Sequence, residues 1–277
     1  RGCGRRARSP GPRLKQVAPW GREPMDGYIL ALHAAVLAAA LFQAATGIGF
    51  GILAGPIILM VMNSGSAVQV TILLSLLIAV VLAPTLYRRA DKNLLRRLLA
   101  GTLAGLPIGI VVFVQVSVDL LKLLAGLAVL FMALSATGLL RQEPLSGKAR
   151  GARVKDYGIG VLSGAMSASL AMPGPVAAAH MSSLAYAKDT IRATILVMFV
   201  FSYSAAIAFQ AVLVGVSGET LSLAATLVPA TLIGILLGRI SVGWIGERGF
   251  RRLISIVLFA TSISLLVVSF KALFGNA

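Results

Sequence analysis

An apolar run interrupted by glycines constrains the fold of this chain more than any other feature. Residues 28–62 are too long and too apolar for one helix of a soluble protein, yet Gly47, Gly49 and Gly51 stand inside them. A second apolar run, 157–187, is interrupted at 173–175 by Pro-Gly-Pro. In hydrocarbon an unpaired backbone group is costly, so a helix breaks at membrane depth only where protein or a water-filled cavity satisfies that group. Two such breaks therefore indicate a solute site.

The composition predicts an all-α polytopic membrane protein. Hydrophobic residues make up 58% of the chain and charged residues 12%, with a mean hydropathy of +0.92. Several apolar runs reach the roughly 20 residues that a bilayer span needs. No stretch alternates apolar and polar residues as the strands of a membrane barrel do. The lipid bilayer is thus a predicted partner.

The formal charge of +16 does not predict nucleic-acid binding, because the basic residues occupy short segments between apolar runs. Cys3 is the single cysteine, which excludes a disulfide framework or thiol relay in the membrane part. Residues 1–24 lack an apolar core and are expected to be a disordered basic leader. Met25 reads as the natural start, with a native basic tail as the alternative.

The distribution of Lys and Arg predicts the topology. If 28–62 and 157–187 are hairpins that return to the side they came from, nearly all basic residues outside the leader fall on one side. Only Lys122 and Lys271 fall on the other side. The positive-inside rule favours this arrangement and places the basic side in the cytoplasm. Whether each hairpin is re-entrant or consists of two unequal spans is left open.

The same arrangement predicts two inverted-topology repeats, each a broken-helix hairpin plus three transmembrane helices. Residues 25–140 form the first repeat, 141–156 a basic cytoplasmic linker, and 157–277 the second repeat. Weak internal similarity supports the division, since Ile108-Gly109 falls where Ile233-Gly234 does. In inverted repeats the solute site lies near the midplane, where the repeats meet, and one repeat is expected to move against the other.

The breaks are suited to an anion. A helix that starts at a break directs free N–H groups and the positive end of its dipole into the break, and an oxyanion held there needs no buried cation. The alternative is that the small residues only pack against neighbouring helices. The predicted substrate site comprises Thr46, Gly47, Gly49, Phe50, Gly51, Pro56, Ser167, Ser169, Pro173, Gly174 and Pro175.

Polar side chains near the breaks are secondary candidates. Gln43, Thr46 and the two serines could donate to a bound oxyanion or bond a carbonyl one turn back. Tyr203 is a candidate liner, with packing as the alternative. His180 could carry a coupled proton, although a packed neutral ring is the common role of a lone histidine. Since no carboxylate falls in the middle of a predicted span, we expect neither proton coupling through one nor a metal site or cofactor.

The chain resembles the sulfite exporter TauE/SafE family of membrane permeases. Thr46-Gly-Ile-Gly-Phe-Gly51 with Pro56, and Ser163-Gly164 followed by Met172-Pro-Gly-Pro175, carry the likeness over roughly residues 28–270. The resemblance implies export or exchange of small sulfur-containing anions, such as sulfite or sulfonates, across the cytoplasmic membrane. The second motif of this chain has Ser169, Ala171 and Pro173 at positions where the family more often has glycines. The residues carried over from the family are Gly47, Gly49, Gly51, Pro56, Gly164, Gly174 and Pro175.

We therefore expect a transporter of a small anion and not an enzyme. A permease for a carboxylate or neutral metabolite is the nearest alternative. An intramembrane enzyme would need a catalytic constellation that the spans lack, and a helical scaffold would not explain two breaks. The sequence leaves the substrate, the coupling ion and homo-oligomer formation open.

Overall fold

The computed structural model describes residues 25–47, 49–137, 149–241 and 247–274, and these form ten α-helices and one short 3-10 helix. The all-helical prediction is confirmed. Six of the helices are long and apolar enough to cross a membrane. The leader 1–24 and residues 141–148 of the predicted linker lie outside the described residues.

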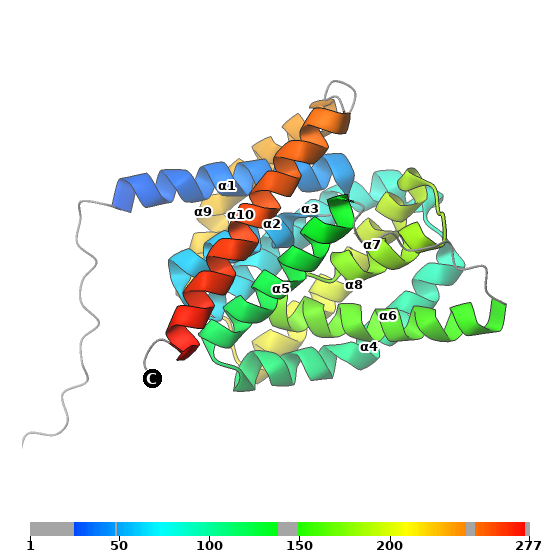
Figure 1. Ribbon diagram of the computed structural model, residues 1–277, viewed down its shortest axis with the longest axis horizontal. Coiled ribbons are helices and arrows are strands. Elements are labelled where there is room, and N and C mark those ends of the chain that lie inside the picture. Colours follow the sequence, from blue (N-terminus) through cyan, green and yellow to red (C-terminus); the bar gives the residue numbers. More distant parts are fainter. Residues whose placement is uncertain (1–24, 48, 138–148, 242–246, 275–277) are drawn as a thin grey trace, which may run out of the picture.

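The two halves of the chain contribute five α-helices each (Figure 1). The first half holds α1 (Met25–Thr46), α2 (Phe50–Met62), α3 (Ser66–Leu86), η1 (Tyr87–Arg89), α4 (Lys92–Gln115) and α5 (Val118–Thr137). The second holds α6 (Ala149–Leu170), α7 (Gly174–Ser183), α8 (Lys188–Leu213), α9 (Gly218–Ser241) and α10 (Glu247–Phe274).

Both interrupted runs consist of a long helix followed by a short one. α2 begins at Phe50, earlier than a break extending to Gly51 would allow, and Pro56 lies inside α2 and does not interrupt it. A proline inside a buried membrane helix is tolerated because neighbouring groups satisfy the freed carbonyl. α6 begins at Ala149, so part of the predicted linker is helical.

Glycines join two pairs of helices that belong to different halves. A Cβ on Gly101, Gly105 or Gly109 of α4 would overlap backbone atoms of α6, and a Cβ on Gly234 or Gly238 of α9 would overlap the backbone of α1. Small residues let membrane helices approach to backbone contact. Hence α4 and α6 form one tightly joined pair, and α1 and α9 form another.

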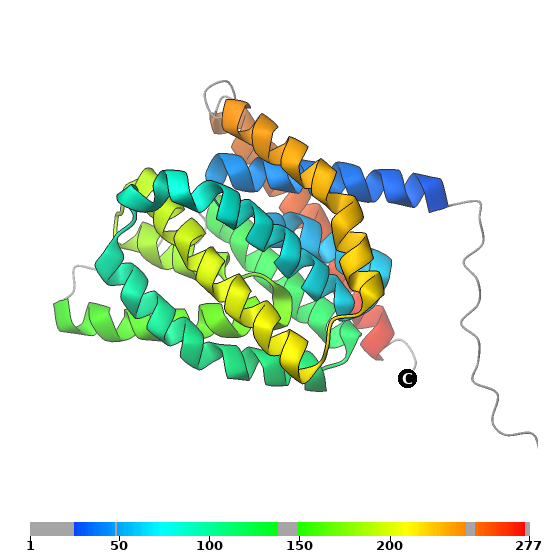
Figure 2. The same ribbon diagram turned by 180° about the vertical axis from the view of Figure 1, so that it is seen from behind.

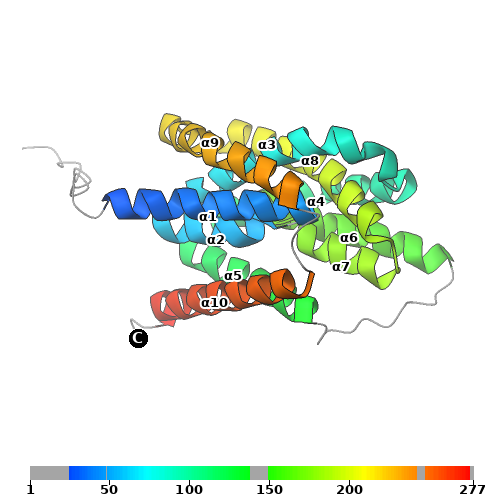
Figure 3. The same cartoon turned by 90° about the horizontal axis from the view of Figure 1, so that it is seen from above.

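The joined pairs run in opposite directions. In Figure 1 α1 and α9 run from the left end of the molecule to the right, whereas α4 and α6 run from right to left. From behind, α8 crosses the bundle between α3 and α4 (Figure 2). Seen from above, α5 and α10 form one side and α3, α8 and α9 lie on the other (Figure 3). The short arms α2 and α7 lie between them.

Polar contacts connect the charged segments at one end of the bundle. Arg89 Nη1 lies 2.7 Å from Asp189 Oδ2, Asp91 N–H donates to Thr194 Oγ1 at 3.0 Å, and Arg239 Nη2 donates to the Val81 carbonyl at 3.0 Å. Arg97 of α4 also bonds to Asp156 of α6. The starts of α4, α6 and α8 and the end of α9 therefore share this end, which we call the basic end. Lys122 does not belong to these charged segments. It is buried, and its Nζ donates to Asn63 and Asp119.

Candidate functional site

The first break is built on two glycines with left-handed backbone. Gly47 has φ 87° and Gly49 has φ 131°, values that a residue with a side chain adopts only under strain. The Gly47 N–H donates to the Gln43 carbonyl at 2.7 Å, at the end of α1. The Gly49 carbonyl accepts from the Leu53 N–H at 2.9 Å, and this is the first helical hydrogen bond of α2. Gly49 also packs against the Phe42 ring, where a Cβ would overlap it.

The second break uses an alanine where the first uses glycine. Ala171 has φ 58°, and its N–H donates to the Ser167 carbonyl at 3.2 Å, which ends α6. Pro173 then occupies the N-cap of α7, with Gly174 and Pro175 in its first turn. Proline suits this position because its missing N–H would have had no helical partner there.

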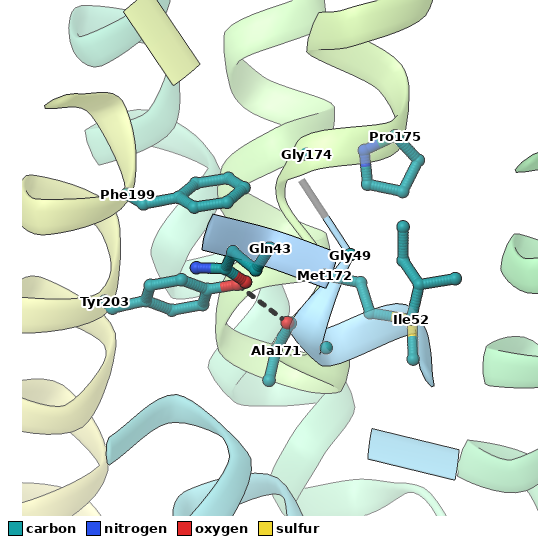
Figure 4. Close-up of a pocket in the computed structure, with 10 residues that line it drawn as sticks. Gln43, Gly49, Ile52, Ala171, Met172, Gly174, Pro175, Phe199 and Tyr203 are labelled. Carbon is teal, nitrogen blue, oxygen red and sulfur yellow. Dashed lines mark hydrogen bonds between the residues drawn. The ribbon is translucent and has the colours of Figure 1, made fainter. Parts of the chain in front are cut away.

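The two breaks meet. A Cβ on Gly51 would overlap the Ala171 carbonyl oxygen, so the start of α2 rests directly on the second break. A small pocket lies at the junction, and Figure 4 shows both breaks converging on it together with Phe199 and Tyr203 of α8. Its lining residues are Gln43, Gly49, Gly51, Ile52, Ala171, Met172, Gly174, Pro175, Phe199 and Tyr203, none of them charged.

Gln43 gives this pocket an unusual polar group. Its side-chain oxygen accepts from the Phe50 N–H at 3.0 Å, an amide in the first turn of α2. Its side-chain nitrogen is buried and has no hydrogen-bond partner. Buried donors are nearly always paired, so an unpaired one calls for an explanation. A solute oxygen in the pocket would supply the acceptor.

Tyr203 closes the opposite wall of the pocket. Its hydroxyl donates to the Ala171 carbonyl at 3.0 Å, as Figure 4 shows, and its ring packs against Phe199 with 5.1 Å between the ring centres. This bond satisfies a carbonyl that the end of α6 leaves outside the helix. Tyr203 thereby fixes the second break in the position that contacts Gly51.

The predicted site residues divide into two groups. Gly49, Gly51, Gly174 and Pro175 line the pocket. The hydroxyls of Thr46 and Ser169 donate to carbonyls one turn back, those of Phe42 and Ala165, as the alternative reading allowed. The residues that are not among those lining the pocket are Thr46, Gly47, Phe50, Pro56, Ser167, Ser169 and Pro173. Ser167 is buried and its hydroxyl has no partner.

Arg192 is a basic residue at the first break that the sequence analysis did not consider. Its side chain covers Gly47, where a Cβ would overlap Arg192 Cγ, and its Nη2 donates to the Ala44 carbonyl at the end of α1. A cation near a helix C-terminus is favourable. Arg192 lies in the second turn of α8, and nothing in the sequence around it indicates its contact with α1.

His180 does not line the pocket but lies in a buried ionic cluster. Its Nε2 is 2.7 Å from Asp156 Oδ1, and Arg97 Nε donates to Asp156 Oδ2 at 2.7 Å. Asp156 is 2% exposed and His180 6% exposed. In the sequence Asp156 falls in the predicted linker 141–156, where no buried carboxylate is expected. The apolar run that begins at Tyr157 concealed that α6 extends further toward its N-terminus.

Asp91 lies beside this cluster, in the connection before α4. Burial alone would raise its pKa, but hydrogen bonds from the Leu94 amide, the Tyr186 hydroxyl and the Asn93 amide lower the pKa below its ordinary value. Burial and the neighbouring Asp91 carboxylate raise the pKa of Tyr186, so its hydroxyl remains a donor. Asp91 thus both caps α4 and holds the segment after α7.

Replacing Asp91 with alanine is expected to lower stability by about 1 kcal/mol at neutral pH, the usual size of an N-cap contribution. Because the folded-state pKa is lowered, the carboxylate stabilises the protein above its ordinary pKa range and loses this effect as the pH falls through the folded-state pKa. Thermal unfolding in detergent at pH 7 and at pH 2, on either side of the lowered pKa of Asp91, measures the difference. An equal gap between the two proteins at both pH values would contradict the assignment.

No group of three or more His, Cys, Asp or Glu side chains in the described part of the chain is arranged to hold a metal ion. The pocket offers backbone amides, an unpaired amide nitrogen and a tyrosine. Such groups can hold and orient a solute by hydrogen bonds. They do not form a nucleophile with its base.

The comparison with family models agrees with this geometry. The model of the sulfite exporter TauE/SafE family matches residues 32–265, which contain both breaks and the whole pocket. No curated protein and no solved structure shows a significant match to the chain. With six helices suited to cross a membrane, the protein is a multi-pass membrane protein, and by the match over most of its length it belongs to the sulfite exporter TauE/SafE family of transporters.

Proposed function

We propose that this protein is a permease that exports or exchanges small sulfur-containing anions, such as sulfite or organosulfonates, through the pocket where the two breaks meet. The observation that carries the proposal is the buried Gln43 amide nitrogen without a partner, beside the start of α2. An oxyanion has several acceptor oxygens and would pair with it. The family match supports the substrate class.

The electrostatics of the pocket favour the binding of an anion that is afterwards released. The N-cap residues Gly49 and Pro173 supply no side-chain cap. In α2 the Gln43 oxygen bonds the Phe50 N–H, and the helix dipoles of α2 and α7 favour an anion at their starts. None of the lining residues that the structure describes is charged. Partial charges hold the anion without the strong pairing that a buried lysine or arginine would add. The cavity volume in this structure is about 10 Å³, close to the space that one water molecule needs.

The architecture supports two inverted repeats, α1–α5 and α6–α10, with the site at the membrane midplane. In the two repeats α1 corresponds to α6, and α4 corresponds to α9. The α4–α6 pair of one arrangement therefore corresponds to the α9–α1 pair of the other. The directions of these helices are opposite (Figure 1). The basic end then faces the cytoplasm of a cell membrane by the positive-inside rule.

The rigid bodies that move during transport are expected to contain helices from both repeats. Because α4 is joined to α6 and α1 to α9 at backbone contact, neither repeat moves as a separate unit. The expected bodies are the α4–α6 pair and the α1–α9 pair with their attached hairpin arms. This replaces the simpler expectation that one repeat moves against the other.

Counterflow of labelled sulfite or methanesulfonate in reconstituted vesicles tests the function. Gln43→Leu removes the unpaired donor at similar volume and is expected to reduce the apparent affinity about 10- to 100-fold, since hydrogen bonds to charged groups contribute about 1.5–3 kcal/mol. The matched control is Gln69→Leu, a buried glutamine that bonds to the Gly215 carbonyl away from the pocket. Wild-type affinity in Gln43→Leu would overturn the site. Counterflow of a carboxylate such as lactate without any of a sulfur oxyanion would overturn the substrate class.

A further inference from the structure

The buried cluster of Arg97, Asp156 and His180 joins three helices at the basic end. Asp156 of α6 accepts from Arg97 of α4 through one carboxylate oxygen and contacts His180 of α7 through the other, both at 2.7 Å. A buried carboxylate keeps its charge only with such partners. Arg97 already neutralises Asp156, so the charge of His180 is free to vary without leaving the carboxylate unpaired.

The cluster holds the short arm α7 against the joined pair α4–α6. A second contact, just after the end of α7, also holds this arm against α4: the Tyr186 hydroxyl donates to Asp91 Oδ2 at 3.0 Å. α7 starts at the pocket with Gly174 and Pro175, so a movement of this arm would change the shape of the pocket. Of the two contacts, only the one at His180 includes a side chain that changes its charge between pH 5 and 8.

The cluster is present at one of the two joined pairs, α4–α6, and not at α1–α9. Backbone contacts pair Gly105 with Val161 and Gly234 with Leu37, and Val161 and Leu37 lie equally far from the ends of α6 and α1. Counting back equally from these pairs, Arg97 corresponds to Thr226 and Asp156 corresponds to Leu32. These counterparts carry no charge, and Leu32 is part of the apolar core. The polar contact at this place is that of His33 Nε2, 3.3 Å from the Thr226 carbonyl oxygen, and it includes no carboxylate.

Other charged groups near α7 are engaged elsewhere. On α8, Asp189 pairs with Arg89, Arg192 bonds to Ala44, and Lys188 is exposed. On α5, Lys122 bonds to Asn63 and Asp119. The groups that face His180 are therefore Asp156 directly, Arg97 through it, and Asp91 with Tyr186 at the end of the arm.

We propose that Asp156 and His180 form a proton-binding site that regulates transport by holding α7 closed. His180 in its neutral form donates its Nε2–H to Asp156. A proton that binds at Nδ1 makes the ring a cation and strengthens its attraction to the carboxylate. The closed arm therefore binds the proton more tightly than the open arm, and by linkage low pH favours the closed arm. The regulation of flux rests on the proposed transport function, whereas the proton site itself does not.

Methanesulfonate exchange in vesicles tests the coupling, because this anion does not titrate between pH 5 and 8. Wild-type exchange is expected to rise at least about fivefold from pH 5 to pH 8, the lower range of ordinary coupling between sites. His180→Gln keeps a hydrogen-bond donor but cannot be charged, and Asp156→Asn removes the carboxylate. Both variants are expected to transport with a flat pH profile. His33→Gln, which changes the other histidine of the chain, is expected to keep the wild-type profile.

A titration without substrate separates this inference from the proposed function. The chain has two histidines, so ¹⁵N-histidine-labelled protein gives two sets of ring signals, assigned with His33→Gln and His180→Gln. The His180 signals are expected to titrate and to shift their midpoint in Asp156→Asn. If they titrate in this way but no sulfur anion is transported, the proton site holds and the function fails. If anion exchange is robust but insensitive to His180→Gln at every pH, the inference is overturned and the function stands.

Discussion

Replacing Gly51 with alanine is expected to reduce anion exchange about 10- to 100-fold in a protein that still folds. The added Cβ would overlap the carbonyl oxygen of Ala171, which is backbone and cannot turn aside as a flexible side chain could. The two breaks would have to separate, at a cost of about 1–3 kcal/mol for overpacking a well-packed site. Separation would also displace Tyr203, which bonds to the same carbonyl. Counterflow in vesicles, with size-exclusion chromatography to verify folding, measures the effect.

Gly55→Ala is the matched control for this variant. Gly55 lies one turn further along α2 and is also buried, but the nearest atoms to its added Cβ would be side-chain carbons of Met172 and Thr71 at 3.4 Å. Those are ordinary contacts, so exchange is expected to stay near the wild-type level. Equal exchange by Gly51→Ala and wild type would show that close contact between the breaks is not needed for transport.

The breaks themselves were predictable because their chemistry is local. Positive φ at Gly47 and Gly49 and a proline at the start of α7 are properties that glycine and proline bring to any chain. The position of the first helix start was less predictable. Gly51 has no left-handed backbone and is instead the point of contact with the second break, so the last glycine of the motif serves packing and not the turn.

The partners of the polar residues were not predictable from one sequence. Arg192 bonds to Ala44, and Tyr203 to Ala171, across long separations in the chain. Periodicity and turn chemistry report on neighbours along the chain and carry no information about such pairs. The burial of Asp156 depends likewise on Arg97 and His180, which come from other helices.

Under the proposed inverted repeats, the internal similarity of the sequence and the helix ends give alignments that differ by one helical turn. The similarity matches Gly109 with Gly234, whereas Gly234 contacts Leu37 as Gly105 contacts Val161, and Leu37 and Val161 lie equally far from the ends of α1 and α6. α4 carries glycines at every fourth position from Gly101 to Gly109. A shift by one turn therefore aligns glycine with glycine again. The packing role that the sequence analysis offered as the alternative applies to these glycines.

Replacing Gly105 with leucine is expected to prevent the protein from folding. Its Cβ would overlap the carbonyl oxygen of Val161 and approach two further backbone atoms of that residue, and leucine adds three more carbons at the same place. Forcing α4 and α6 apart would also open the contacts of Gly101 and Gly109 with α6. The cost of overpacking, about 1–3 kcal/mol at one site, would be multiplied along the joined pair and exceed the margin of most domains. Yield of monodisperse protein after membrane extraction measures the result.

Gly158→Leu is the control for leucine in a helix of the same pair. No atom lies within 4 Å of a Cβ added to Gly158 of α6, so this variant is expected to fold and to exchange anions at the wild-type level. The comparison also bears on how the protein moves, because it asks whether backbone contact between α4 and α6 is needed. A folded and active Gly105→Leu would mean that the two helices can separate. The bodies that alternate access would then be the repeats themselves, and not the helix pairs that join them.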